Sequence, residues 1–176
     1  MPIKLSNRLG AIAGYIEDGA AVADIGSDHG YLPAYLAANG LARRIFASDI
    51  SERSLSSARR TAEKYRVAEA ITFVTTPGLS GFEFADIDTI IIAGMGGETI
   101  SGILADAPWL KERSAKLILQ PQTKAVKLCL WLSDNGYAIR DSKYARDRGR
   151  RYVIIVCQSN GVNGAEPILK NSSAQF

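Results

Sequence analysis

The segment Val22–Pro33, VADIGSDHGYLP, carries charge where a nucleotide-binding turn normally has none. A short apolar stretch leads to two glycines, Gly26 and Gly30, and then to a predicted helix. In a dinucleotide-binding loop, such glycines allow the backbone to approach a pyrophosphate at the helix N-terminus. Asp28 lies between the two glycines, and its carboxylate would repel a diphosphate. The loop therefore suits a cationic ligand better than a phosphate.

S-Adenosylmethionine is such a ligand, because it carries a sulfonium and an ammonium group and no phosphate. On this interpretation Asp24, Gly26, Asp28 and Gly30 belong to the turn around its methionine end. Asp49 ends the next apolar run, 23 residues after Gly26, which is the spacing of a carboxylate that binds ribose hydroxyls. The alternative is that Asp24 and Asp28 only cap the helix that follows.

Two further segments could line the site of a methyl acceptor. Ile87–Ile100, IDTIIIAGMGGETI, predicts a buried strand that runs into a glycine-rich turn. Gly94, Gly96 and Gly97 would allow a planar ring to approach main-chain amides, although tight packing of the turn explains them as well. The amide side chains of Leu117–Gln122, LILQPQ, could bond base edges, and a plain strand exit is an equal alternative.

Basic residues are concentrated in two segments, although the net charge is only +3. Arg140–Arg151 contains six basic residues against two aspartates, and a second group lies on a predicted helix around Arg59 and Arg60. Such clusters can bind a phosphate backbone, and a solvated surface is the alternative. The residues that we expect to contact RNA are Arg146, Arg148, Arg150 and Arg151.

The elements that must position these residues alternate between strand and helix. Between most of the apolar runs lie helix-like stretches, which predicts a parallel sheet covered on both faces. The expected strands are Ala21–Ile25, Arg44–Ser48, Ala70–Val74, Thr89–Ala93 and Lys116–Gln120, and the expected helices are Tyr31–Asn39, Ser51–Tyr65, Gly97–Leu104 and Lys124–Asn135. A further amphipathic helix is expected within Lys4–Ile16.

The last two apolar runs, Tyr137–Lys143 and Tyr152–Gln158, have no helix between them. Joined by the polar segment YARDRGRR, they predict an antiparallel hairpin. The fold class is therefore α/β, the Rossmann-like fold of class I S-adenosylmethionine-dependent methyltransferases, with a seven-stranded, mostly parallel sheet and an antiparallel C-terminal hairpin. We expect a methyltransferase domain over residues 1–158, with its first helix within residues 1–16, and a flexible tail over 159–176.

Composition limits the remaining possibilities. The chain of 176 residues is 47% hydrophobic and 22% charged, which is typical of one globular domain. Its longest apolar run is far shorter than the roughly 20 residues of a membrane span, and no secretory signal is recognisable. With one histidine and two cysteines, Cys129 and Cys157, we expect buried free thiols and no metal site. These features indicate a cytoplasmic protein.

From about Lys4 to Val156 the chain resembles the bacterial TrmK family, tRNA (adenine-N1)-methyltransferases that act on adenine twenty-two of the D-arm. The motifs LSNRLGAIAGYI, ADIGSDHGYLP, IIAGMGG and LILQPQ carry the resemblance by their order and spacing. It implies S-adenosylmethionine as the donor and tRNA as the acceptor. It also places Asp24, Gly26, Asp28, Gly30, Asp49, Ile50 and Gly78 at the donor, Asp28 and His29 near the methyl-transfer centre, and Gly94, Met95 and Gly96 in the acceptor wall.

Two features depart from the family pattern. After the third strand the family typically has GDGL, whose aspartate lies near the donor's adenine, whereas this chain has TPGL, Thr76–Leu79. Pro77 cannot accept that hydrogen bond, so either another side chain binds the adenine or the donor binds more weakly. The family also usually continues into a C-terminal helical region, which we expect to be absent here.

The expected chemistry is a methyl transfer to a base that needs no deprotonation, because adenine N1 has a lone pair at neutral pH. Positive charge develops on the adenine as the methyl group arrives, and Asp28 is our candidate for stabilising it. The base must leave its stack, and His29 or Tyr31 could stack on it, although Tyr31 could equally pack in the core. The alternatives are a methyltransferase acting on another RNA or on protein, and a non-catalytic RNA-binding module with this fold.

Overall fold

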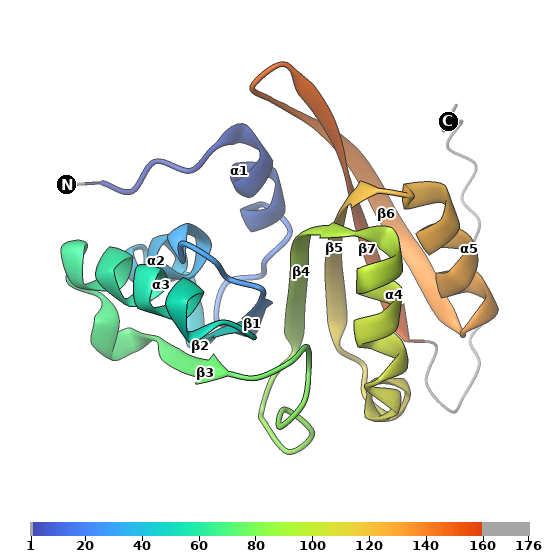
Figure 1. The fold of residues 1–176 in the computed structure, drawn as a ribbon, viewed down its shortest axis with the longest axis horizontal. Coiled ribbons are helices and arrows are strands. Elements are labelled where there is room, and N and C mark those ends of the chain that lie inside the picture. The colour runs from blue at the N-terminus through green and yellow to red at the C-terminus, as the bar shows by residue number, and fades with distance from the viewer. Residues whose placement is uncertain (1, 160–176) are drawn as a thin grey trace.

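The computed structural model describes residues 2–159, which form one sheet with helices on both faces (Figure 1). The strands lie in the order β3-β2-β1-β4-β5-β7-β6. They are β1 Ala20–Ile25, β2 Ala42–Asp49, β3 Thr72–Thr75, β4 Thr89–Gly96, β5 Lys116–Thr123, β6 Tyr137–Asp147 and β7 Arg150–Ser159. The pairs among β1 to β5 are parallel, whereas β7 runs antiparallel to both β5 and β6. The predicted seven-stranded sheet with a C-terminal hairpin is confirmed.

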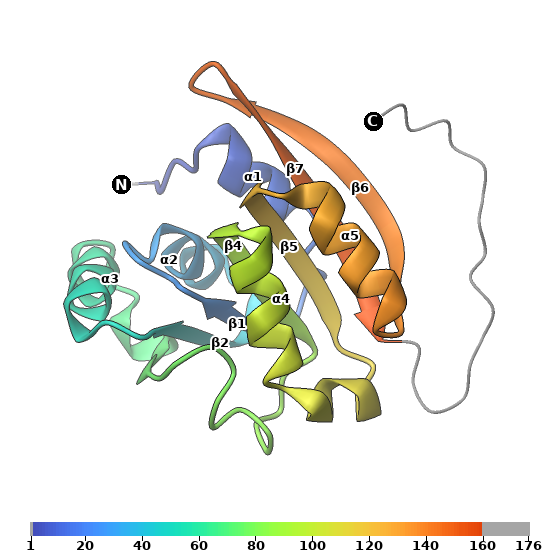
Figure 2. The same cartoon turned by 45° about the vertical axis from the view of Figure 1, so that its right-hand side comes forward.

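The helices form two layers. In chain order they are α1 Asn7–Ala13, α2 Tyr31–Ala38, α3 Glu52–Lys64, α4 Gly97–Ala105 and α5 Ala125–Asp134, with short 3-10 helices at Ala68–Ala70 and Pro108–Glu112. One apolar core, which includes Ile12, Leu36 and Ile91, joins α1, α2 and α3 to one face of the sheet. The other core, around Ile92, Ile100 and Leu128, joins α4 and α5 to the opposite face (Figure 2).

The central strands form because their residues can be buried on both faces. All six residues of β1 are buried, as are the first four of β4, which is typical of parallel strands covered by helices on both sides. α3 shows the complementary helical pattern, with Leu55, Ala58 and Ala62 buried. The Ser51 side chain caps it by accepting a hydrogen bond from the Ser54 amide.

The order of the strands determines where a ligand can bind. From β1 the chain passes to β2 on one side of the sheet, while β4 pairs with β1 on its other side. In open α/β sheets, ligands bind beyond the carboxyl ends of the strands at such a switch point. The carboxyl ends of β1, β2 and β4, together with the loop after β1, contain most of the aspartates and glycines singled out in the sequence, and they meet at this edge.

The hairpin differs from its prediction. The segment YARDRGRR was expected to be a polar connection, but Tyr144–Asp147 continues β6 and Arg150–Arg151 begins β7. Only Arg148 and Gly149 form the turn, with φ of +49° and +76°, as a two-residue type I′ turn requires. These residues are polar although they pair as strands, because the hairpin tip projects beyond the sheet edge, beside α1, and most of its side chains contact water (Figure 1).

Smaller differences concern the ends of elements. α1 covers only seven residues of the predicted Lys4–Ile16, because Ser6 caps its start and Gly14 its end. Gly94 and Gly96 lie in β4, which is irregular around Met95, so the expected glycine-rich turn is a distorted strand end. Ser159 ends β7, one residue after the predicted domain limit at 158, and the rest of the predicted tail lies outside the described residues.

Candidate functional site

The loop between β1 and α2 is held against the end of β2 by its own backbone. The amides of Gly26 and Ser27 both donate to the carbonyl of Ser48, at 2.8 and 2.9 Å. Gly26, Asp28 and Gly30 have positive φ, which only glycine adopts without cost. A side chain at Gly30 would also overlap Ala58 of α3, because a Cβ there would lie 2.7 Å from the Ala58 Cβ. The two glycines are therefore required by backbone conformation and by close packing.

The three aspartates of this edge have different environments. Asp24 is 7% exposed, and its carboxylate accepts a 2.8 Å hydrogen bond from the Ser27 hydroxyl. Asp49 accepts hydrogen bonds from the backbone amides of Ser51, at 2.9 Å, and of Asp28, at 3.4 Å. The side chain of Asp28 is 66% exposed and lies 3.6 Å from the Nε2 atom of His29. The loop therefore holds Asp24 and Asp49 in place and leaves the Asp28 carboxylate exposed.

Burial raises the pKa of Asp24 to about 6. The hydrogen bond from Ser27 and the nearby charge of Arg8 oppose this increase, while the charge of Asp49 adds to it. A buried carboxylate with a raised pKa gains by contact with a cation, because the cation compensates for the lost hydration. Asp24 is therefore suited to bind a positively charged group of a ligand.

The alternative that Asp24 and Asp28 cap the following helix is wrong. The residue at the N-cap of α2 is Gly30, and no side chain bonds to the first turn of that helix. The only side-chain hydrogen bond of Asp24 within the described residues is the one from Ser27. Both carboxylates are therefore available for other contacts.

Two adjoining cavities open at this edge, and Gly26, Asp49 and Met95 line both of them. The first cavity has a volume of about 500 Å³ and extends along the end of β3. Of the predicted donor residues it contains Gly26, Asp49, Ile50 and Gly78, and Ile50 is 74% exposed at its rim. Thr76, Pro77 and Leu79 of the TPGL segment also line it, and the walls that sequence reasoning did not identify are formed by Ser80, Thr99, Ile103 and Asp106.

The second cavity has a volume of about 320 Å³ and lies between the β1–α2 loop, the end of β4 and α1. It brings together most of the remaining predicted residues, namely Asp24, Asp28, His29, Gly30, Gly94 and Met95. Gly96 is the exception, because it lines neither cavity and instead lies against Thr123, whose hydroxyl would be 3.3 Å from an added Cβ. The methyl group of Met95 approaches Gly26 so closely that a Cβ there would lie 2.2 Å from it. Met95 and Gly26 thus form the boundary between the two cavities.

His29 and Tyr31 form the aromatic side of the second cavity. Their ring centroids are 6.2 Å apart with the rings tilted by 51°, and both residues line the cavity. Tyr31 is 46% exposed, so the alternative that it packs in the core is wrong. These two rings are therefore accessible to a planar ligand.

Arg8 is a site residue that sequence reasoning missed. It projects from α1 into the second cavity, where its Nη1 atom donates to Gln120 Oε1 at 2.8 Å. Gln120 itself is completely buried and donates to the carbonyl of Pro121, so its amide positions Arg8 and does not face a base. Gln122, by contrast, lines the cavity. Only the position of Arg8 within the motif LSNRLG could have drawn attention to it, because Gln120 lies 112 residues away.

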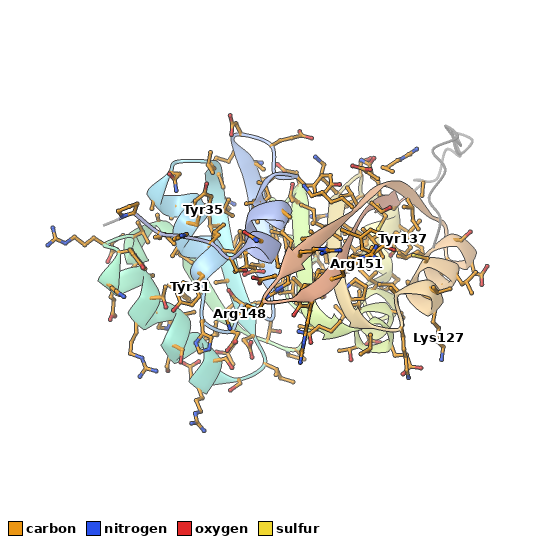
Figure 3. The ribbon with its side chains drawn as sticks, turned by 90° about the horizontal axis from the view of Figure 1, so that it is seen from above. Tyr31, Tyr35, Lys127, Tyr137, Arg148 and Arg151 are labelled. Carbon is orange, nitrogen blue, oxygen red and sulfur yellow. The ribbon has the colours of Figure 1, made fainter. Side chains whose placement is uncertain are left out.

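Four arginines occupy the hairpin tip. Arg148 is in the turn, Arg150 pairs with Asp147 across the two strands, and Arg146 pairs with Arg151. Within residues 2–159 none of the four guanidinium groups forms an ion pair. The tip is fixed to α1 by a hydrogen bond of 3.1 Å from the Asn7 side chain to the Arg146 carbonyl. Figure 3, which looks down on the ligand-binding edge, shows the hairpin crossing towards the side that carries α2, with Arg148 at its tip.

Some expectations concern absent features. Cys129 and Cys157 are free thiols, as predicted, but only Cys157 is buried, whereas Cys129 is half-buried. The described residues contain no group of three or more histidine, cysteine, aspartate or glutamate side chains that could hold a metal ion. None of the described helices is long and apolar enough to cross a membrane.

Comparison with known proteins gives consistent results. A methyltransferase domain family matches residues 5–155. The tRNA (adenine(22)-N(1))-methyltransferase of Bacillus subtilis is 37% identical over 163 residues, which cover 93% of this chain and 68% of the relative. The crystal structure of the B. subtilis M1A22 tRNA methyltransferase TrmK has a TM-score of 0.83 at 38% identity, covering 90% of this chain and 68% of that one. A Streptococcus pneumoniae protein solved with S-adenosyl-L-methionine has a TM-score of 0.84 at 32% identity, covering 92% and 76%.

Proposed function

This chain belongs to the family of tRNA (adenine(22)-N(1))-methyltransferases, and we infer that it transfers a methyl group from S-adenosyl-L-methionine to N1 of adenine 22 in tRNA. The relatives that match most of the chain are named as tRNA methyltransferases, which supports tRNA as the acceptor over another RNA or a protein. Donor binding by a relative of the same fold supports an enzyme and not a non-catalytic RNA-binding module. We also propose a cytoplasmic location.

The residues of the two cavities fit S-adenosylmethionine. When bound, the donor supplies an electrophilic methyl group on a sulfonium. Asp24 would bind the ammonium group, since its buried carboxylate gains most from a cation. Asp49, whose carboxylate is held by two backbone amides, would accept hydrogen bonds from the ribose hydroxyls. Gly26 keeps the backbone free of a side chain at the boundary between the cavities, and Gly30 allows the loop to pack against Ala58 of α3.

The first cavity would hold the adenine of the donor. Ile50 and Gly78 line this cavity and would provide apolar and backbone surface for it. Pro77 lines the same cavity and offers no side-chain acceptor, but Asp106, at the end of α4, lines it as well. Within the described residues, the Asp106 side chain makes no hydrogen bond or ion pair. It is therefore free to accept a hydrogen bond from the adenine amine in place of the aspartate that the family pattern has at Pro77.

The second cavity would hold the target adenine. His29 and Tyr31 offer rings on which an extruded base can stack, and Gly94 and Met95 form the facing wall. Gly96 does not line this cavity and would contribute only through the backbone conformation at the end of β4. Gln122 and Arg8 complete the rim with a hydrogen-bonding amide and a fixed positive charge.

Catalysis then requires positioning and electrostatic stabilisation more than acid–base chemistry. N1 carries a lone pair, so the side chains need only align the base with the methyl group and exclude water. Positive charge develops on the ring and its exocyclic amine during transfer. Asp28, whose carboxylate is exposed towards the second cavity, would accept a hydrogen bond from that amine.

The hairpin tip would bind the tRNA backbone. Arg146, Arg148, Arg150 and Arg151 carry no carboxylate partners in the described part of the chain, and all four side chains are exposed. The hairpin projects above the edge that contains both cavities (Figure 1). Phosphates on either side of the target nucleotide could therefore be contacted while the base occupies the second cavity.

The observation that carries this function is the meeting of Asp24, Asp28 and Asp49 around two joined cavities below a basic hairpin. We expect the protein to transfer labelled methyl groups from S-adenosylmethionine to unmodified tRNA, and not to ribosomal RNA or to protein, when the three acceptors are offered separately. Labelling of ribosomal RNA or protein, with none in tRNA, would exclude the proposed substrate. Asp49→Ala serves as a matched control that should label no acceptor at low donor concentration.

A further inference from the structure

A third cavity lies on the other side of the end of β5. It has a volume of about 310 Å³, and its walls include Gln122, Lys124, Val126, Tyr144, Arg151 and Val153. They come from the end of β5, the start of α5 and the outer part of the hairpin. Neither donor binding nor methyl transfer uses this cavity.

Strand geometry brings an aromatic ring and a cation together in the third cavity. Tyr144 on β6 lies opposite Val153 on β7, and Arg151 is two residues before Val153, so the three side chains share one face of the hairpin. The guanidinium carbon of Arg151 lies 4.3 Å from the centroid of the Tyr144 ring. The other face, with Ala145 and Tyr152, packs towards α1. The Tyr144–Arg151 pair therefore has a defined position although it lies near the hairpin tip.

The pair is available to a ligand. Tyr144 is 53% exposed and Val126, which lines the same cavity, is 61% exposed. Lys124 is not a free cation, because it pairs with Glu98, which also pairs with Lys127 and has its pKa lowered to about 2 by these two lysines. Arg151 has no carboxylate partner within residues 2–159. The cavity thus offers an aromatic ring, an apolar wall and one unpaired positive charge, which is the chemistry that binds a nucleobase and its phosphate.

The third cavity adjoins the acceptor site. Gln122 lines both the second and the third cavity, so only the end of β5 separates them. An RNA strand that places its target adenine in the second cavity therefore brings a neighbouring nucleotide to the third. We propose that the third cavity binds the base of the nucleotide next to the target adenine, stacked on Tyr144 and Arg151. This inference rests on the proposed function, since it requires that the acceptor is RNA.

The experiment compares wild type, Tyr144→Ala and Tyr144→Phe by tRNA binding and by single-turnover methylation. Phe84→Ala is the matched control, because Phe84 is 97% exposed and lines none of the three cavities. We expect Tyr144→Ala to weaken tRNA binding about tenfold, while Tyr144→Phe, which keeps the ring, stays within about twofold of wild type. S-Adenosylmethionine binding, which reports correct folding, should be unchanged in all variants.

A second substrate identifies the occupant. Two further tRNAs each lack one base, on the 5′ or on the 3′ side of the target adenine. With one of these two abasic tRNAs, wild type and Tyr144→Ala should bind with equal affinity. Equal binding of intact tRNA by these two proteins would overturn the proposal, as would an undiminished difference on both abasic tRNAs. Failure of wild type to methylate intact tRNA would instead contradict the proposed function, so the two failures are distinguishable.

Discussion

At the scale of single residues, the site is defined by carboxylates in different environments. Asp24 is buried, Asp49 is held by backbone amides and Asp28 is exposed, although all three lie at the ends of neighbouring strands. The sequence could predict these residues because the spacing of a β1–loop–α2–β2 unit fixes which residues reach the same edge. It could not predict Arg8 or Asp106, since each reaches its cavity only through the packing of a distant helix.

Asp28 is predicted to act in the chemical step. Asp28→Asn keeps the shape of the side chain but removes its charge, so single-turnover methyl transfer at saturating donor should fall about tenfold or more. Donor affinity, measured by calorimetry, should change little because the Asp28 carboxylate is exposed at the rim. A wild-type rate in the folded variant would exclude the electrostatic role.

Asp49 and Asp106 are predicted to bind the two ends of the donor's nucleoside. Asp49→Ala should weaken S-adenosylmethionine binding by about 1–3 kcal/mol, because the variant has no fixed acceptor for the ribose hydroxyls.

Asp106→Ala should weaken binding of S-adenosylhomocysteine but not of its inosine analogue, which lacks the amine. Calorimetry on both ligands measures this, with Asp134→Ala at the exposed end of α5 as the control. If Asp106→Ala reduced the affinity for both ligands equally, Asp106 would not accept a hydrogen bond from the adenine amine.

The buried Asp24 predicts a pH-dependent stability of the unliganded protein. Its pKa is raised from 3.8 to about 6, so between these values the folded state binds the proton more tightly than the unfolded chain. This contribution is fully present below pH 3.8 and is lost as the pH rises through 6, a difference of about 3 kcal/mol. Urea unfolding should therefore show that Asp24→Asn gains stability relative to wild type between pH 4 and pH 7.5. A constant difference between the two proteins would show that Asp24 is not desolvated.

At the scale of elements, the hairpin shows what sequence patterns miss. The five parallel strands and four of the helices could be predicted to within a few residues, because apolar periodicity follows from burial in the two cores. Near the hairpin tip both faces are largely polar, so the segment after Tyr144 resembles a loop although it is paired strand. The pairing matters for function, because it places Arg146 and Arg151 on one face and Arg150 on the other.

The same element carries a prediction about salt. Contacts between arginine and phosphate release counterions, so tRNA affinity should fall steeply with salt concentration. Replacing Arg146, Arg148 and Arg150 together by alanine should reduce the slope of log K against log salt by about one unit or less for each arginine that binds a phosphate. A variant with Arg43, Arg44 and Lys111 replaced, which lie near the starts of β2 and β5 on the opposite edge of the sheet, is the matched control for the change in charge. Identical slopes for the hairpin variant and wild type would show that the tip is only solvated surface.

At the scale of the whole molecule, the two faces of the sheet supply different parts of the site. α1 and α2 on one face surround the second cavity, α4 on the other face closes the first, and the hairpin extends above both (Figures 1 and 2). The strand order alone, with its switch between β1 and β4, accounts for the position where these parts meet. Donor, base and RNA backbone can therefore be bound from one edge of a single domain.

The most direct test of this account is to identify the methylated nucleoside. Unmodified tRNA is incubated with the protein and S-adenosylmethionine, digested with a base-specific ribonuclease and analysed by mass spectrometry. We predict 1-methyladenosine at position 22, none in a tRNA with guanine at that position, and the same product formed more slowly by Asp28→Asn. Methylation of a different atom or position, or no transfer to tRNA by a folded protein that binds the donor, would contradict it.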